Sequence, residues 1–245
     1  MSPHHNTNHL KAYFARWLLI FSVIFATCYA VVSICCELAS ANVLYQGSFW
    51  LEALYITRQI CHSLTFSALM GFLLYGLYRL DVKECRVLLL ATFESLLYLA
   101  LINLFSYIIV NAAWSPDGML SLALQMLREM LFEALVLAAF YGLSFLILRT
   151  AKSRGEGTYI PYASAFSFRN PMQGSALVGA FLLFLPVLIE NVSFDIYYGA
   201  PEGVGDWLGL LLYYLVDTLV CLILPYIAIL LVCKKADAFY QRTLQ

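Results

Sequence analysis

The sequence predicts an all-α integral membrane protein, a bundle of about six transmembrane helices with both termini in the cytoplasm. Three observations lead to this prediction: the composition, the length of the apolar stretches and the placement of the basic residues. Of the 245 residues, 62% are hydrophobic and only 12% are charged, whereas a soluble domain has about 25% charged residues. The mean hydropathy is +0.81. A lipid bilayer is therefore the expected environment.

Six apolar stretches are long enough to cross a bilayer. A spanning helix needs about 20 apolar residues, because its backbone polar groups have to be hydrogen-bonded internally. The expected spans cover residues 17–36, 49–77, 87–110, 122–148, 175–193 and 207–233. The second and fourth exceed one membrane thickness, so we expect them to tilt or to project from it. Residues 17–233 are thus predicted to form one transmembrane domain.

Both ends of the chain are polar. Residues 1–16 lead into the first span without a small-residue cleavage site, so we expect a cytoplasmic tail and a first span that is retained. His4, His5 and His9 in this tail have no acidic or cysteine ligand beside them, so no metal site is expected there. Residues 234–245 are expected to form a second cytoplasmic tail.

The basic residues set the predicted orientation. Every lysine and arginine except Arg58 and Arg128 lies in a terminal tail, at the edge of a span, or in the connection between spans two and three or four and five. The alternate connections hold only acidic charges, at Glu37, Asp117, Asp195, Glu202 and Asp206. Cytoplasmic loops are rich in Lys and Arg, so this alternation predicts an even number of spans. The short loops favour the cell membrane, and specifically a bacterial cytoplasmic membrane.

The longest cytoplasmic connection, residues 149–173, is a candidate contact surface. Its aromatic residues alternate with small and polar ones: Tyr159, Tyr162, Phe166 and Phe168. Aromatic rings favour the headgroup region of a membrane. Docking of a membrane or cytoplasmic protein partner is an equal hypothesis, and a plain linker explains the segment as well as these two together.

Prolines mark three helical features. Asn170 before Pro171 predicts an N-cap followed by proline at the first helical position, where the fifth span begins. Pro186 and Pro225 each remove a backbone hydrogen bond within a span. We therefore expect kinks in the fifth and sixth spans.

Polar side chains gather in the outer halves of four predicted spans. An ionisable side chain inside a bilayer is costly and usually faces a cavity or a partner. The candidate cavity residues are Arg58, Gln59, His62, Arg128, Glu129, Glu133, Glu190 and Asp217. Helical spacing puts Gln59 and His62 on one face, and Glu129 and Glu133 on another. Two interpretations fit this pattern about equally well. The charges line an outward-facing polar cavity for a small polar or anionic solute, or they pair with one another and hold the helices together.

The sequence contains no familiar catalytic motif: no HExxH, no G-x-S-x-G elbow, no P-loop and no G-x-G-x-x-G. The seven cysteines show no CxxC and lie mostly in apolar runs, as is typical of buried thiols. No enzymatic activity, cofactor or metal is therefore expected. A membrane enzyme that uses Glu129, Glu133 or Asp217 with His62 is the least favoured alternative. The formal net charge of −1 predicts no nucleic-acid partner.

Two functions fit these patterns. The first, a solute-binding transport subunit or small transporter, ranks ahead because the charged side chains gather on one side of the membrane. Its layout resembles that of the substrate-capturing subunits of energy-coupling-factor vitamin transporters: six spans, both ends inside and a site toward the outside. The resemblance implies that Ala26 and Ala30, four residues apart on the first span, dock a coupling subunit. The alternative is a non-catalytic scaffold or assembly partner in an envelope complex.

Overall fold

The structure, a computed structural model, describes about two thirds of the chain. The described residues are 16–17, 20, 23–24, 27–36, 39, 49–79, 90, 92–94, 96–98, 100–101, 119–153, 170–198 and 203–243. Every regular element within them is helical. The principal helices are α2 (Phe49–Arg79), α4 (Met119–Ser153), α5 (Pro171–Tyr198), α6 (Val204–Thr218), the π-helical turn η3 (Leu219–Ile223) and α7 (Leu224–Thr243). The predicted all-α fold class is confirmed for this part of the chain.

Four helical segments are long and apolar enough to cross a membrane, judged by length and composition. They are Ala53–Tyr78, Met130–Ser153, Pro171–Ile189 and Val204–Ala236. These segments correspond to the second, fourth, fifth and sixth predicted spans. A shorter apolar helix, Thr27–Cys36, lies within the first predicted span. The chain is therefore described as a multi-pass membrane protein with at least these four candidate spans.

Several predicted features fall wholly or mostly outside the described residues. They are the third span at 87–110, the N-terminal tail at 1–16 and the aromatic part of the 149–173 connection. The predicted C-terminal tail at 234–245 is helical as far as Thr243. Residues 226–243 contain neither glycine nor proline, so nothing in the backbone ends the helix at the membrane boundary.

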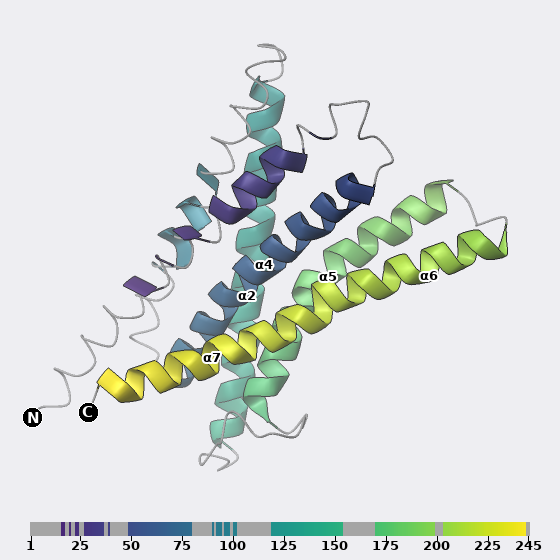
Figure 1. Cartoon of the computed structure of the whole chain (residues 1–245). Helices are drawn as coiled ribbons and strands as arrows, with labels where there is room; N and C mark the ends of the chain where they lie inside the picture. Colours follow the sequence, from purple (N-terminus) through teal and green to yellow (C-terminus); the bar gives the residue numbers. More distant parts are fainter. Residues whose placement is uncertain are drawn as a thin grey trace, which may run out of the picture.

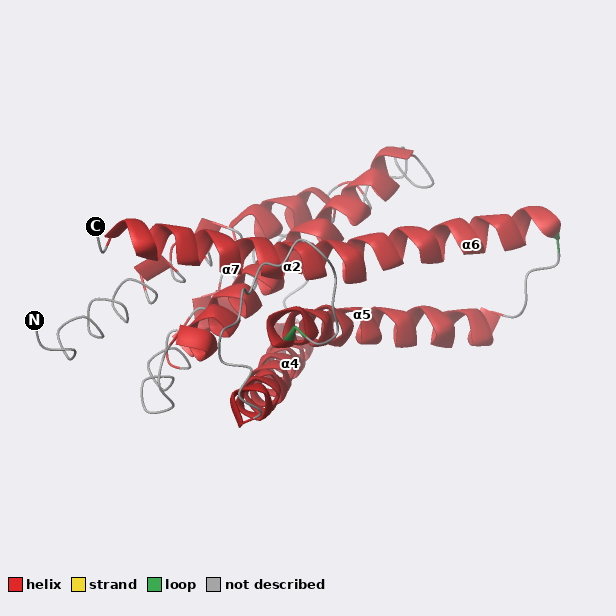
Figure 2. Ribbon diagram, turned by 90° about the horizontal axis from the view of Figure 1, so that it is seen from below, coloured by secondary structure: helices red, strands yellow, loops and turns green. Residues whose placement is uncertain are grey.

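Helix α2 lies at the centre of the bundle. Its apolar window is 78% buried, compared with 22% for α4 and 28% for the α6–α7 rod. Figures 1 and 2 show α6 continuing through η3 into α7 as one rod, with α5 beside it in the opposite direction and α4 crossing steeply. Exposed leucines cover the outer faces of α4 and α6: Leu131, Leu135, Leu146, Leu208, Leu211 and Leu215. Such extended apolar faces are typical of surfaces that contact lipid or protein.

The densest packing occupies one half of the bundle. The fully buried side chains there come from all the long helices: Phe66, Leu69, Met70, Leu73, Leu74, Tyr75, Phe140, Met172 and Ile229. Gly71 allows α2 and α7 to approach, because a Cβ at this position would lie 2.7 Å from Cβ of Val232 and 2.9 Å from the carbonyl oxygen of Ile229. The Cys233 thiol donates to the Gly71 carbonyl oxygen at 3.1 Å. Small residues at such crossings are common between membrane helices.

The start of α5 follows the predicted cap. Oδ1 of Asn170 accepts hydrogen bonds from the N–H groups of Met172 at 3.0 Å and Gln173 at 3.2 Å. Pro171 is the first helical residue, where its missing N–H costs no helical hydrogen bond. The predicted N-cap is confirmed.

The two internal prolines have different surroundings. Helix α5 continues through Pro186 as one α-helix. Pro225 is preceded by η3, in which the Leu224 N–H donates to the carbonyl oxygen of Leu219, five residues earlier. The sequence predicted a lost hydrogen bond near Pro225, and the helix accommodates it with a π-turn, a feature that is frequent at functional sites.

Candidate functional site

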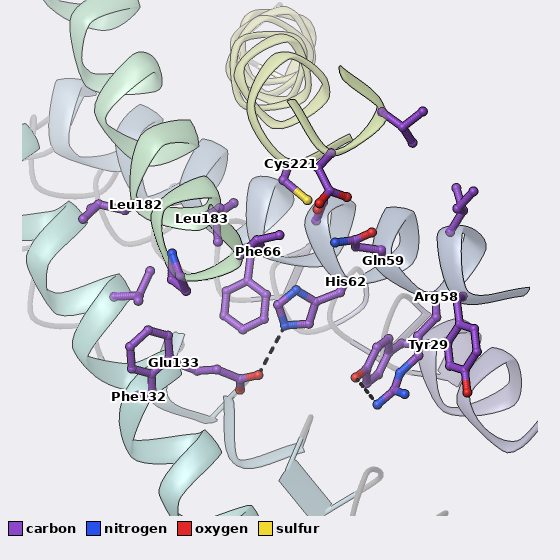
Figure 3. Close-up of a pocket in the computed structure, with 18 of the residues that line it drawn as sticks. Tyr29, Arg58, Gln59, His62, Phe66, Phe132, Glu133, Leu182, Leu183 and Cys221 are labelled. Carbon is purple, nitrogen blue, oxygen red and sulfur yellow. Dashed lines mark hydrogen bonds and ion pairs between the residues drawn. The ribbon is translucent and has the colours of Figure 1, made fainter. Parts of the chain in front are cut away.

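A cavity of about 1180 Å³ lies between the helix Thr27–Cys36, α2, α4, α5, α6 and η3. Its polar wall residues include Arg58, Gln59, His62, Ser63, Arg128, Glu133 and Asp217. Its aromatic wall residues are Tyr29, Tyr55, Phe66, Phe132 and Tyr213. Ligand sites in proteins are usually concave and largely apolar, with a few convergent polar groups. This cavity is therefore the candidate site, and Figure 3 shows its labelled residues.

The cavity brings together most of the predicted site residues. Arg58, Gln59, His62, Arg128, Glu133 and Asp217 all line it, although they come from three different helices. Glu129 lies in α4 and Glu190 in α5, but their side chains are outside the described part of the structure. Helical spacing in the sequence placed Gln59 and His62 on one face of α2, and both line the cavity. That α2, α4 and α6 meet around this cavity follows from the fold and not from the spacing.

The cavity and the packed core occupy successive parts of the helices, one after the other along their length. On α2, residues 55–66 include the cavity wall and residues 66–77 enter the core. On α4, the wall residues lie between 128 and 136, and the core begins at Leu137. Phe66, which is 1% exposed, belongs to both. The core therefore closes the cavity at the end that leads toward Tyr75.

His62 and Glu133 link α2 to α4 across the cavity. Nε2 of His62 lies 3.4 Å from Oε1 of Glu133, and Figure 3 shows the carboxylate directed at the ring. The imidazole also contacts two aromatic rings, with centroids 5.6 Å from Tyr29 and 4.7 Å from Phe66. These contacts hold the histidine ring so that one nitrogen faces the carboxylate.

Arg58 is positioned by Tyr29 from the helix Thr27–Cys36. Its Nη2 donates to the Tyr29 hydroxyl at 3.4 Å, and its guanidinium carbon lies 5.7 Å from the centre of the Tyr29 ring. Arginine in this position gains a cation–π attraction as well as a hydrogen bond. Tyr29 is a site residue that sequence reasoning missed. Its only signal in the sequence is a phenol within an apolar span, which does not specify a partner on another helix.

Arg128 and Asp217 are the remaining formal charges on the described walls. Arg128 is exposed, and no side chain that the structure describes forms a hydrogen bond or an ion pair with it. Asp217 is 3% exposed and lies on α6, two residues before η3 begins at Leu219. A buried carboxylate is retained in a membrane helix at a considerable desolvation cost. These two residues present opposite charges from different walls.

Comparisons with protein-family models, with curated proteins and with solved structures find no match to this chain. The resemblance in layout to vitamin-transporter subunits therefore has no relative to support it. Ala30 is buried at 6% exposure, and Ala26 lies outside the described residues. The chemistry of the cavity is the remaining basis for a function.

The cavity walls offer several kinds of chemical group to a ligand. They combine guanidinium, carboxylate, imidazole and amide groups with aromatic rings. Within the described residues, no group of three or more His, Cys, Asp and Glu side chains is placed to hold a metal ion. His62 and Glu133 add one contact between an imidazole and a carboxylate, with Nε2 and Oε1 3.4 Å apart.

Proposed function

We propose that this chain is a six-span protein of the cell membrane, with both termini in the cytoplasm, that binds a small polar solute in an outward-facing cavity. In this proposal it acts as a solute-binding transport subunit or as a small transporter, and it releases the solute chemically unchanged. The observation that carries the proposal is the convergence of polar residues from α2, α4 and α6 on one cavity.

The distribution of charge along the helices supports the outward direction. Basic residues occur at the core end of α2, α4 and α7: Arg79, Arg149, Lys152, Lys234 and Lys235. Lysine and arginine mark the cytoplasmic side of membrane helices. Because the cavity lies at the opposite end of α2 and α4 from these residues, it faces outward in the proposed orientation.

The surroundings of Arg128 favour a ligand-binding cavity over a set of ion pairs that only hold the helices together. If the polar residues served only to hold helices together, we would expect each cavity arginine to have a carboxylate partner. Arg128 has none among the residues that the structure describes. An exposed guanidinium on a cavity wall is instead a ready partner for an acidic group of a solute.

The scaffold function remains the alternative proposal. Its predicted docking surface, the aromatic part of the 149–173 connection, lies outside the described residues. The exposed leucines of α4 and α6 are equally well suited to lipid. No observation on the described helices favours a scaffold over a solute-binding protein.

Co-purification tests the proposal. The tagged protein would be purified in a mild neutral detergent, and the molecules released on denaturation identified by mass spectrometry. We expect a small polar molecule with the wild type that is lost from the double variant Arg128→Gln/Glu133→Gln. Arg149→Gln is the matched control, since Arg149 is an exposed arginine of α4 outside the cavity. Recovery of envelope proteins with no small molecule would support the scaffold instead.

A further inference from the structure

One histidine lies on the cavity wall beside a carboxylate. Nε2 of His62 is 3.4 Å from Oε1 of Glu133, and Figure 3 shows the two side chains directed at each other from α2 and α4. The side chains are 39% and 21% exposed, respectively, and both line the cavity. The pair is therefore accessible to a solute in the cavity and is not enclosed in the packed core.

The second nitrogen of the His62 ring is open to a proton. The ring is held by Phe66 and Tyr29, with centroids 4.7 Å and 5.6 Å away. No side chain that the structure describes forms a hydrogen bond with Nδ1. Histidine is the side chain that ordinarily changes charge between about pH 5 and pH 8. Because Nε2 is directed at a carboxylate, a proton that binds at Nδ1 turns this contact into an ion pair between α2 and α4.

The other titratable and charged groups on the described walls come from four elements. They are Tyr29 of the helix Thr27–Cys36, Tyr55 and Arg58 of α2, Arg128 of α4, Tyr213 and Asp217 of α6, and Cys221 of η3. The described wall residues of α5 are all apolar: Leu182, Leu183, Pro186 and Val187. Within this set and the His62–Glu133 pair, the imidazole is the group that ordinarily titrates near neutral pH.

Protonation of His62 makes the cavity more attractive to an anion. It adds a positive charge to walls that already carry the guanidinium groups of Arg58 and Arg128. Charges interact more strongly in a cavity partly shielded from water than in bulk solvent, and guanidinium groups pair well with carboxylates. Apolar wall residues such as Phe132 and Leu183 offer contacts to a carbon skeleton. An organic carboxylate matches both kinds of wall.

We propose that the cavity takes up an organic carboxylate together with a proton, and that His62, held by Glu133, binds this proton. The proton comes from the medium and stays on Nδ1 while the solute is bound, so no bond of the solute is made or broken. Since the two binding events are linked, each raises the affinity for the other by the same factor. This inference rests on the proposed solute-binding function and adds the class of solute and its coupling ion.

The linkage has a definite sign. Histidine is protonated at acidic pH, so the affinity for a carboxylate should be high near about pH 5.5 and should fall toward about pH 8. Coupling between two binding sites typically changes an affinity by about 5- to 150-fold. An amide of the same shape carries no charge, so its affinity should not depend on pH in this range.

The test uses benzoate as the probe and benzamide as its uncharged counterpart, with the full-length protein in neutral detergent. Titration calorimetry gives the dissociation constants at about pH 5.5 and about pH 8, with protein-free micelles as the blank. Titrations between these pH values, in two buffers with different heats of ionisation, show whether binding takes up protons. We expect the wild type to bind benzoate at least about fivefold more tightly at the acidic pH, with proton uptake, and benzamide equally at both.

Variants separate a proton site from a contact that only holds the helices together. His62→Gln keeps a hydrogen-bonding side chain that does not titrate, so it should bind benzoate equally at both pH values and without proton uptake. Glu133→Gln removes the charge that favours a protonated imidazole, so it should reduce the ratio between the two affinities. Arg149→Gln, outside the cavity, should keep the wild-type ratio. If His62→Gln fails to fold, the Glu133→Gln comparison still tests the pair.

Three results would overturn the inference: a benzoate affinity that does not change with pH, a pH dependence that survives unchanged in His62→Gln or Glu133→Gln, or no binding of benzoate at either pH. Co-purification separately tests whether the protein holds a solute of any class. A recovered solute without a carboxylate would keep the solute-binding function and reject this inference. Recovery of no solute from the wild type would count against the function itself.

Discussion

His62 of α2 and Glu133 of α4 face each other inside the bundle, with Nε2 and Oε1 3.4 Å apart. The pair connects the most buried of the four candidate spans to the least buried one, since 78% of the apolar window of α2 is buried and 22% of that of α4. The ring of His62 also contacts Tyr29 and Phe66. The His62 side chain thus lies on the cavity wall and contacts both the helix Thr27–Cys36, through Tyr29, and the first core residue of α2, Phe66.

A double-mutant cycle should detect the His62–Glu133 contact. We expect the single variants His62→Gln and Glu133→Gln to be non-additive, with a coupling energy of about 0.2–1 kcal/mol. The value is modest because the two side chains are 39% and 21% exposed. Thermal unfolding in detergent gives the four stabilities, and strictly additive effects would show that the two groups do not interact.

Gly71 should tolerate no side chain. In Gly71→Ala the new Cβ would lie 2.7 Å from Cβ of Val232, so α2 and α7 have to separate. We expect a loss of about 1–3 kcal/mol, as for other overpacked contacts. The measurement is the midpoint of thermal unfolding in detergent.

Gly142→Ala is the control for this variant. No atom lies within 4 Å of a Cβ built at Gly142 of α4, and alanine favours a helix over glycine by about 0.5–1 kcal/mol. It should therefore leave the midpoint unchanged or raise it. Equal midpoints for the two alanine variants would contradict the close approach of α2 and α7.

The Asn170 cap should contribute to the stability of α5. Asn170→Ala removes the acceptor for the Met172 and Gln173 N–H groups, and loss of an N-cap costs about 1 kcal/mol. Asn170→Ser keeps an oxygen acceptor and should retain most of the stability. Hydrogen exchange of the first turn of α5 reports the change directly, and identical exchange in the two variants would argue against the cap.

The sequence predicted those features that depend on residues within a single helix. Apolar length predicted α2, α4, α5 and the α6–α7 rod, and Asn170 with Pro171 predicted the start of α5. Helical periodicity placed His62 and Glu133 on polar faces of their own helices. These features depend on residues a few positions apart.

Features that depend on how helices meet were not predictable in this way. Tyr29 and Arg58 are 29 positions apart and lie on different helices, so their contact follows from the packing of the bundle. Pro225 predicted that one helical hydrogen bond is missing. It did not predict the π-turn at Leu219–Ile223, in which the Leu224 N–H donates to the carbonyl oxygen of Leu219. The extension of α7 to Thr243 likewise reflects helix-forming residues beyond the apolar stretch.

Accessibility of the cavity from outside the cell is the most direct test of the proposed function. Gln59→Cys places a thiol on the cavity wall, and Lys152→Cys places one at the exposed core end of α4. Intact cells would be treated with a membrane-impermeant maleimide, and labelling read at each site by peptide mass spectrometry, with the native cysteines as internal references. We predict that Gln59→Cys is labelled in intact cells and Lys152→Cys only after permeabilisation. Labelling of Gln59→Cys only after permeabilisation would contradict an outward-facing cavity.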